Sequence, residues 1–171
     1  MTATLQNYRD TLAAELLPAM GCTEPIALAY AAAVAGARLG GYPDRMTAEV
    51  SRNIVKNVKS VIVPNTGGLY GIEAAVIAGF VSRRPEAELE VLAAVTPDEC
   101  AEIGRRVEAG GLEIHQTDEP DVFFIRVTGE RAGKTVSVTT RTFHTNITEI
   151  VKTVKLFSRR KKNTSAMMRM P

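Results

Sequence analysis

Residues 25–39 read PIALAYAAAVAGARL, and the rest of the chain can be interpreted around this stretch. Apolar side chains occur on nearly every face of the helix that it predicts, so we expect this helix to be buried in the middle of the protein. Pro25 is tolerated in a first helical turn, and Gly40 and Gly41 end the helix. The many alanine residues would let neighbouring helices pack closely.

The segments around this helix are predicted to be mainly helical up to residue 84. Amphipathic helices are expected over 4–19 and 69–82, because apolar side chains recur there at three- and four-residue spacing. Residues 46–52 predict a short strand, whereas 53–60 fit either a helix or a loop.

Residues 85–152 have a different pattern. A strand is predicted over 89–95, and Thr96-Pro97-Asp98-Glu99 then forms a capping box that begins a helix ending near residue 108. The stretch 129–133 is a tight turn between two strands. Four further strands are predicted, over 112–116, 122–128, 135–141 and 146–152.

The predicted fold class is therefore α+β. A helical part (1–84) packs on a mostly antiparallel sheet with one covering helix, and 85–152 form a β-α-β-β-β-β layer. Residues 153–171 show neither helical nor strand periodicity, and we expect a basic, disordered tail there.

Composition excludes several classes of protein. The 171 residues are 45% hydrophobic and 23% charged, which is typical of a globular chain and not of a disordered one. Two cysteines are too few for a disulfide scaffold. The N-terminus does not resemble a signal peptide, and no apolar run reaches the roughly 20 residues that span a bilayer. We therefore expect a cytoplasmic protein with no membrane contact.

Charge is unevenly distributed along the chain. Residues 151–171 carry seven of the 21 basic residues and none of the 19 acidic ones, which leaves 14 basic against 19 acidic residues in 1–150. An acidic body argues against nucleic-acid binding. The alternative to a disordered tail is a basic segment that contacts RNA or an acidic partner.

The first candidate site is Gly21-Cys22-Thr23-Glu24-Pro25, at the expected start of the buried helix. Thr23 can cap this helix, and the positive end of its dipole would lower the pKa of the Cys22 thiol. Such a thiolate can act as a nucleophile, a base or a ligand of a soft metal, and the free N–H groups nearby can hold a carboxylate. The alternative is a small buried cysteine beside an ordinary helix cap.

Two further segments carry candidate binding residues. Asn53, Lys56 and Asn57 could together bind a carboxylate and an amino group, and the loop 64–68 leads a glycine pair into a helix. The segment 144–146 places a histidine, suited to acid–base chemistry near neutral pH, beside hydrogen-bonding side chains. Each pattern alone also fits an ordinary structural role.

Taken in order, these motifs resemble the L-cysteine desulfidase family, which includes uncharacterised bacterial proteins related to the α-chain of iron–sulfur L-serine dehydratases. The resemblance covers about residues 5–152 and rests on GCTEPIA (21–27), NIVKN (53–57), PNTG (64–67) and HTNI (144–147). It implies a lyase that eliminates sulfide or water from a small L-amino acid, with release of ammonia and pyruvate and without pyridoxal phosphate. A [4Fe–4S] cluster with an open iron would bind the leaving group.

The resemblance also implies roles for individual residues. Cys22 matches the cysteine of the reaction centre, and His144 matches the third motif, so both are candidate catalytic residues. The residues expected to bind substrate are Thr23, Glu24, Asn53, Lys56, Asn57, Thr66, Gly67 and Asn146. His115, on a predicted strand, and Cys100, on a predicted helix, are interpreted as structural.

This chain departs from that family in length. Intact members are more than twice as long, and their other cluster cysteines lie in the C-terminal half. Two thiols cannot hold a cluster that needs three or four, so we expect no cluster in this chain alone, with Cys22 as a possible single ligand. The likeness stops after about Thr153. We therefore interpret the chain as an N-terminal half, from a truncated or frameshifted gene, that is weakly active or inactive alone.

Apolar surface left open by a missing half would favour a homo-oligomer or pairing with a separately encoded C-terminal half. The alternative function is a non-catalytic small-molecule binding or assembly module. The sequence does not distinguish cysteine from serine as the substrate.

Overall fold

The computed structural model describes residues 3–15 and 21–154, with side chains from 5–12 and 21–154. The helices are α1 (Ala3–Glu15), α2 (Thr23–Leu39), α3 (Arg52–Val58), α4 (Gly71–Ser82) and α5 (Pro97–Ala109), with a short 3-10 helix η1 (Pro85–Glu90). The strands are β1 (Arg45–Ser51), β2 (Leu112–Thr117), β3 (Phe124–Arg131), β4 (Lys134–Arg141) and β5 (Ile147–Val154).

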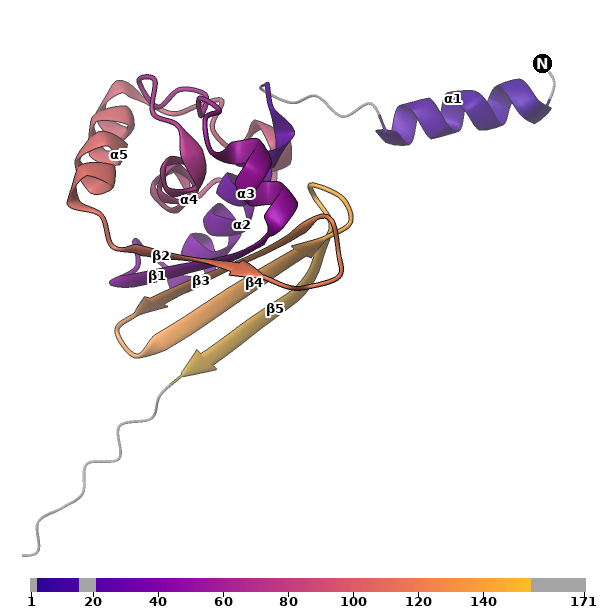
Figure 1. Cartoon of the computed structure of the whole chain (residues 1–171). Coiled ribbons are helices and arrows are strands. Elements are labelled where there is room, and N and C mark those ends of the chain that lie inside the picture. The colour runs from indigo at the N-terminus through magenta and orange to yellow at the C-terminus, as the bar shows by residue number, and fades with distance from the viewer. Residues whose placement is uncertain (1–2, 16–20, 155–171) are drawn as a thin grey trace, which may run out of the picture.

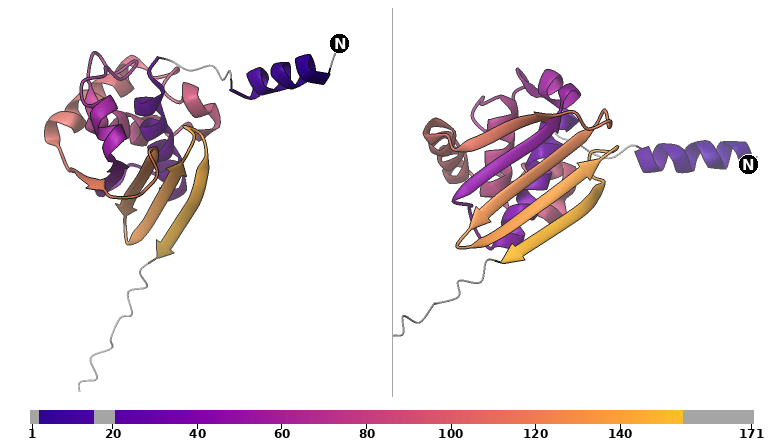
Figure 2. Two further views of the ribbon diagram at one scale, coloured as in Figure 1. Left: turned by 45° about the vertical axis from the view of Figure 1, so that its right-hand side comes forward. Right: turned by 60° about the horizontal axis from the view of Figure 1, so that its bottom comes forward.

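In these residues the strands form one mixed sheet in the order β2-β1-β3-β4-β5. Strand β1 runs parallel to β2, and the other neighbouring pairs are antiparallel. The helices α2 to α5 lie on one face of this sheet (Figures 1 and 2). The α+β class and the mostly antiparallel sheet predicted from the sequence are thus confirmed. Strand β1 comes from the N-terminal helical segment, so both predicted parts of the chain contribute to the sheet.

Helix α2 is buried along most of its length, as its sequence predicts, and Ala37 and Arg38 near its C-terminal end are exposed. It contacts β3 and β4 on one side and α4 on another. Small residues permit this packing: a side-chain carbon added at Gly79 of α4 would lie 2.1 Å from the carbonyl oxygen of Ala29. The inward face of the sheet completes the core with Ala48, Val127 and Val138, which lie side by side on neighbouring strands and are fully buried.

Most predicted helix and strand positions are confirmed, with two helical segments now defined more closely. The ambiguous stretch 53–60 contains α3, and the first amphipathic helix is present over Ala3–Glu15. The Thr96 capping box is present, with its hydroxyl accepting from Glu99 N at 3.2 Å and Thr96 N donating to the Glu99 side chain at 2.9 Å. The turn between β3 and β4 is Ala132-Gly133, and both residues have positive φ as a two-residue hairpin requires.

The strand predicted over 89–95 was wrong. This stretch contains the end of η1 followed by turns. Its apolar side chains Leu89, Val91 and Leu92 are buried in the core, so the run is apolar because it packs, not because it joins the sheet. A short buried run does not distinguish a strand from helical turns.

Two other predictions lie partly outside the described residues. One is the end of the first predicted helix, over 16–19, and the other is the predicted tail from 155 onward. The first two residues of that predicted tail, Thr153 and Val154, belong to β5. Within 3–15 and 21–154, no helix has both the length and the apolar character needed to cross a membrane.

Candidate functional site

Cys22 lies at the N-cap position of α2, with its thiol exposed. It has extended backbone angles, and its side chain makes no capping bond to the helix. The thiol instead donates a hydrogen bond to Glu24 Oε2, with 3.0 Å between the sulfur and the oxygen. Thr23, predicted as the cap, is the first residue of the helix, and its hydroxyl faces another element.

That other element is the connection between β4 and β5, which carries His144. Thr23 Oγ1 and His144 Nε2 are 2.9 Å apart, at hydrogen-bond distance. The imidazole also packs edge-on against the Phe123 ring, with 4.7 Å between the ring centroids. Burial lowers the pKa of His144, although the charge of Glu24 opposes this effect. The imidazole is therefore neutral near pH 7, which suits a proton acceptor.

Helix α3 completes the group. Asn57 Nδ2 donates to Glu24 Oε1 at 3.3 Å. Cys22, Thr23, Glu24, Asn57 and His144, from three separate segments, are called the Cys22 cluster below. Sequence reasoning named all five residues, and the structure brings them together at the start of α2.

Glu24 is the central acceptor of this cluster. The hydrogen bond from Cys22 lowers the pKa of Glu24 most, and the bond from Asn57 and the nearby His144 add to this effect, against burial. The carboxylate is ionised at neutral pH. It accepts one hydrogen bond on each oxygen, so its orientation is fixed.

The expected low thiol pKa was wrong. Burial, the hydrogen bond to Glu24 and the negative charge of that carboxylate raise the pKa of Cys22, and a backbone hydrogen bond at Glu24 opposes them only in part. The prediction considered the helix dipole alone. In the structure burial raises the pKa of this thiol most, and the hydrogen bond to Glu24 and the charge of that carboxylate add to the effect, so the thiol keeps its proton at neutral pH.

Asn53 and Lys56 have a different environment from Asn57. They line a cavity of about 470 Å³, the α3 cavity, together with Ser51, Arg52 and the loop 117–122. This loop is acidic, but Arg141 pairs with two of its carboxylates, at 2.9 Å from Glu119 Oε2 and also with Asp121. The acidic run Asp118-Glu119-Pro120-Asp121 between two predicted strands could have indicated this wall of the cavity, but the sequence analysis did not use it.

The α3 cavity and the Cys22 cluster share one wall. Ser51 Oγ, just before α3, donates to the carbonyl of Val122 at 2.7 Å. The next residue, Phe123, carries the ring that contacts His144. The segment 122–123 therefore connects the two parts of the candidate site.

Three predicted binding residues contact neither the Cys22 cluster nor the α3 cavity. Thr66 is buried and donates to the carbonyl of Val63 at 2.8 Å, which holds its own loop together. Gly67 has a φ of 74°, and a side-chain carbon there would meet the sulfur of Cys100 at 3.4 Å. Asn146 donates to the carbonyl of Arg141 at 3.0 Å. In the described structure these contacts are structural ones.

The described side chains do not provide a complete metal site. No group of three or more His, Cys, Asp or Glu residues in 5–12 and 21–154 is arranged to hold a metal ion. A [4Fe–4S] cluster needs three or four thiolates, and the Cys22 cluster offers one. This donor set does not fit such a cluster by itself.

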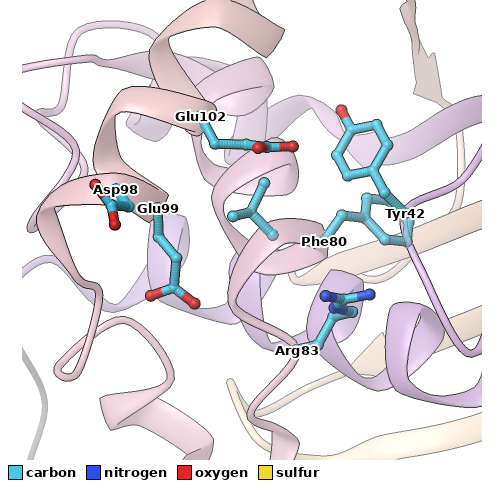
Figure 3. A pocket seen from close by; sticks show the side chains of 7 residues that line it. Tyr42, Phe80, Arg83, Asp98, Glu99 and Glu102 are labelled. Carbon is cyan, nitrogen blue, oxygen red and sulfur yellow. The ribbon is translucent and has the colours of Figure 1, made fainter.

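A second cavity, of about 240 Å³, lies between α4 and α5 (Figure 3). The rings of Tyr42 and Phe80 face the acidic side chains of α5 across it. Two of these three carboxylates are already paired: Glu99 lies 2.7 Å from Arg84, and Glu102 lies 2.7 Å from Arg106. We therefore assign this cavity to the framework that holds α5 in place.

The chain is similar to proteins named only "UPF0597 protein". That of Desulfitobacterium hafniense (strain Y51) is 44% identical over 147 residues, which cover 86% of this chain and 34% of the relative. That of Treponema denticola is 42% identical over 142 residues, covering 83% and 33%. That of Lachnoclostridium phytofermentans is 44% identical over 146 residues, covering 84% and 34%.

The chain thus spans about a third of the length of the curated relatives it matches. No protein-family profile and no solved structure matches it. The relatives' names state neither an activity nor a substrate, so the likeness to L-cysteine desulfidases and serine dehydratases stays a prediction.

Proposed function

We propose that this chain carries part of a reaction site for a small L-amino acid, of the kind that eliminates sulfide from L-cysteine or water from L-serine. The observation that carries the proposal is the Cys22 cluster. An exposed thiol, an ionised carboxylate and a neutral imidazole meet there from distant parts of the chain. Side chains that can accept and hold protons, brought together at an accessible surface, are typical of acid–base sites.

The α3 cavity is the proposed seat of the amino acid. Lys56 and Asn53 on one wall supply a positive charge and an amide for the α-carboxylate. Asp118 on the opposite wall supplies a negative charge for the ammonium group. Arg141 neutralises the neighbouring acidic side chains, so the cavity presents both charges that a zwitterion needs.

The Cys22 cluster supplies the proton chemistry. In the elimination, a base removes the proton on Cα, the bond from Cβ to sulfur or oxygen breaks, and the leaving group departs as sulfide or water after protonation. His144 is the proposed base, held by Thr23 and kept neutral by burial. Glu24 is the proposed acceptor of the Cys22 proton when the sulfur binds another group. The aminoacrylate product then hydrolyses to pyruvate and ammonia.

The [4Fe–4S] cluster implied by the resemblance would act as a Lewis acid on the leaving group. Since the donor set of the described chain does not fit a cluster, no step is assigned to it here. We propose that the further ligands belong to polypeptide equivalent to the other two thirds of the relatives, and that the chain alone turns over weakly or not at all. A second candidate function is amino-acid binding without turnover, which the raised pKa of Cys22 favours because a protonated thiol is a poor nucleophile.

Calorimetric titration with L-cysteine and L-serine tests the proposed binding site. We expect saturable binding that Asn53→Ala and Lys56→Met weaken and that Lys134→Met, a matched change at the exposed far end of β4, leaves intact. Equal binding by all four proteins, or none by any, would contradict the α3 cavity as the seat.

Release of sulfide, pyruvate and ammonia, measured after anaerobic cluster reconstitution, separates the lyase from the binding module. Turnover that His144→Gln abolishes supports the lyase, and binding without turnover supports the module. Stoichiometric iron and labile sulfide in the purified chain would contradict the conclusion that its residues cannot hold a cluster.

A further inference from the structure

Helix α1 has an apolar stripe that the described residues leave exposed. Leu5, Tyr8 and Leu12 lie on one side of it at three- and four-residue spacing, with exposed fractions of 54%, 65% and 54%. Figures 1 and 2 show α1 standing apart from the sheet and from the other helices. A lone helix of 13 residues is marginally stable in water, so a packing partner for this stripe would stabilise it.

The body of the protein has a groove of matching character. Its volume is about 590 Å³, and it lies between α2, η1 and β5. Tyr30, Val34 and Ala37 form one wall, on a single face of α2, while Ile147 and Ile150 of β5 form the other. Both isoleucines are only half-buried.

The two surfaces match in length. Leu5 and Leu12 are seven residues apart, and so are Tyr30 and Ala37. At 1.5 Å per helical residue each stripe is roughly 10 Å long, so an antiparallel α1 would set its three apolar side chains along the α2 wall. The groove also carries one charge of each sign, on Glu86 and Arg38.

We propose that this groove receives α1 of a second copy of the chain, so that two copies exchange helices in a symmetric dimer. The stripe and the groove lie on the same chain, which makes the contact reciprocal and closes the assembly at two copies. Since α1 stands apart from its own body, its stripe is open to a second copy. Each dimer would contain two helix-in-groove contacts.

Sedimentation equilibrium on four proteins tests the exchange. We expect the unmodified chain to have twice its 18.5 kDa mass. Tyr8→Asp places a charge in the stripe, and Ala37→Glu places one in the exposed wall of the groove. Each should raise the dimer dissociation constant at least about tenfold. Asn7→Asp, which adds the same charge on the polar side of α1, should leave it unchanged.

Mixing the two defective variants provides the decisive measurement. The Tyr8→Asp chain keeps an intact groove, and the Ala37→Glu chain keeps an intact α1, so an equimolar mixture can form one good contact per pair. We expect heterodimers in the mixture at concentrations where each variant alone is monomeric. Thermal melts of both variants, followed by circular dichroism, show whether the body remains folded.

Three results would overturn the proposal. One is an unmodified chain that is monomeric in solution. If Tyr8→Asp then lowered the melting temperature of this monomer, α1 would pack on its own body. Another is equal dissociation of the Asn7→Asp and Tyr8→Asp dimers. The third is a mixture of folded variants that stays monomeric.

Discussion

At the start of α2 the Cys22 thiol and the Glu24 carboxylate share one hydrogen bond, with the proton on sulfur. Asn57 holds the other oxygen of the same carboxylate. The pair stores a proton at an exposed position, next to a neutral imidazole. A ligand that binds the sulfur as thiolate must displace this proton, and Glu24 is the nearest group that can take it.

Replacing Glu24 by Gln should therefore make Cys22 more reactive. The substitution removes the carboxylate whose hydrogen bond and charge help to raise the thiol pKa, so a larger fraction is thiolate at a given pH. Alkylation near pH 7.5 should therefore be faster than in the unmodified chain. The measurement is the pH dependence of iodoacetamide labelling in a Cys100→Ser background. Glu90→Gln, far along the chain, serves as the charge control, and an unchanged rate in Glu24→Gln would contradict the assignment.

His144 should make stability depend on pH. Its pKa is lowered in the folded state, so the unfolded chain binds the proton more readily. The unfolding free energy should therefore fall as pH drops below about 6.5, until the folded-state pKa is reached. Glu24 contributes at lower pH, below about 4.3, because its own pKa is lowered.

Urea denaturation between pH 7.5 and 5 tests this dependence. His144→Gln should flatten the profile in that range, while His115→Gln, on the exposed strand β2, should not. If the unfolding free energy of the two variants depended on pH in the same way, groups other than His144 would cause the pH dependence.

At the residue scale the sequence named the side chains that meet at the start of α2, but it did not predict the chemical state of Cys22. The motif around Cys22 and the histidine near residue 144 could be found because they combine rare residue types with helix and strand ends. The direction in which the pKa of Cys22 is shifted could not be predicted, because it depends on the orientation of the Glu24 side chain. The contact between Thr23 and His144 joins residues that are distant in sequence, and no local pattern encodes it.

At the scale of elements, α3 is the short helix that divides the candidate site. Asn57 faces the Cys22 cluster, while Asn53 and Lys56 face the α3 cavity. The sequence left this segment open between helix and loop, because seven residues are too few for a clear periodicity. The same limit led to the wrong strand over 89–95. The longer amphipathic and capped helices were predicted well, since their signals extend over several turns.

Two glycines on neighbouring helices should respond in opposite ways to the same substitution. In Gly79→Ala the new methyl group would clash with the Ala29 backbone, so we expect a loss of at least about 1–3 kcal/mol in unfolding free energy. In Gly104→Ala the methyl group meets no atom within 4 Å, and a gain of about 0.5–1 kcal/mol is expected from helix propensity. Urea denaturation of both variants checks the pair, and destabilisation of equal size would refute the close α2–α4 packing.

At the scale of the whole molecule, the candidate site lies where the start of α2, helix α3 and the β4–β5 connection meet. It therefore exists only when the sheet is complete. The chain matches about a third of each curated relative, and Cys22 remains exposed in this third. Under the proposed function, further polypeptide would cover this exposed position.

Binding of the proposed ligand should stabilise the folded chain. At L-cysteine concentrations of 100 times the dissociation constant, the gain in unfolding free energy would be about 2.7 kcal/mol. Differential scanning fluorimetry should then show a higher melting temperature with L-cysteine and a smaller shift with D-cysteine. Lys56→Met should remove the difference between the enantiomers, and equal shifts with both would argue against a stereospecific site.

The central position of β1 has a consequence for biosynthesis. This strand leaves the ribosome early, yet Met46 pairs with Leu112 on one side and Gly129 on the other, which are translated much later. Contacts between such distant residues form slowly, because a long loop must close first. The apolar surface of α2 therefore stays exposed to solvent until strands β3 and β4 have been synthesised. We expect nascent chains to need a chaperone during that interval.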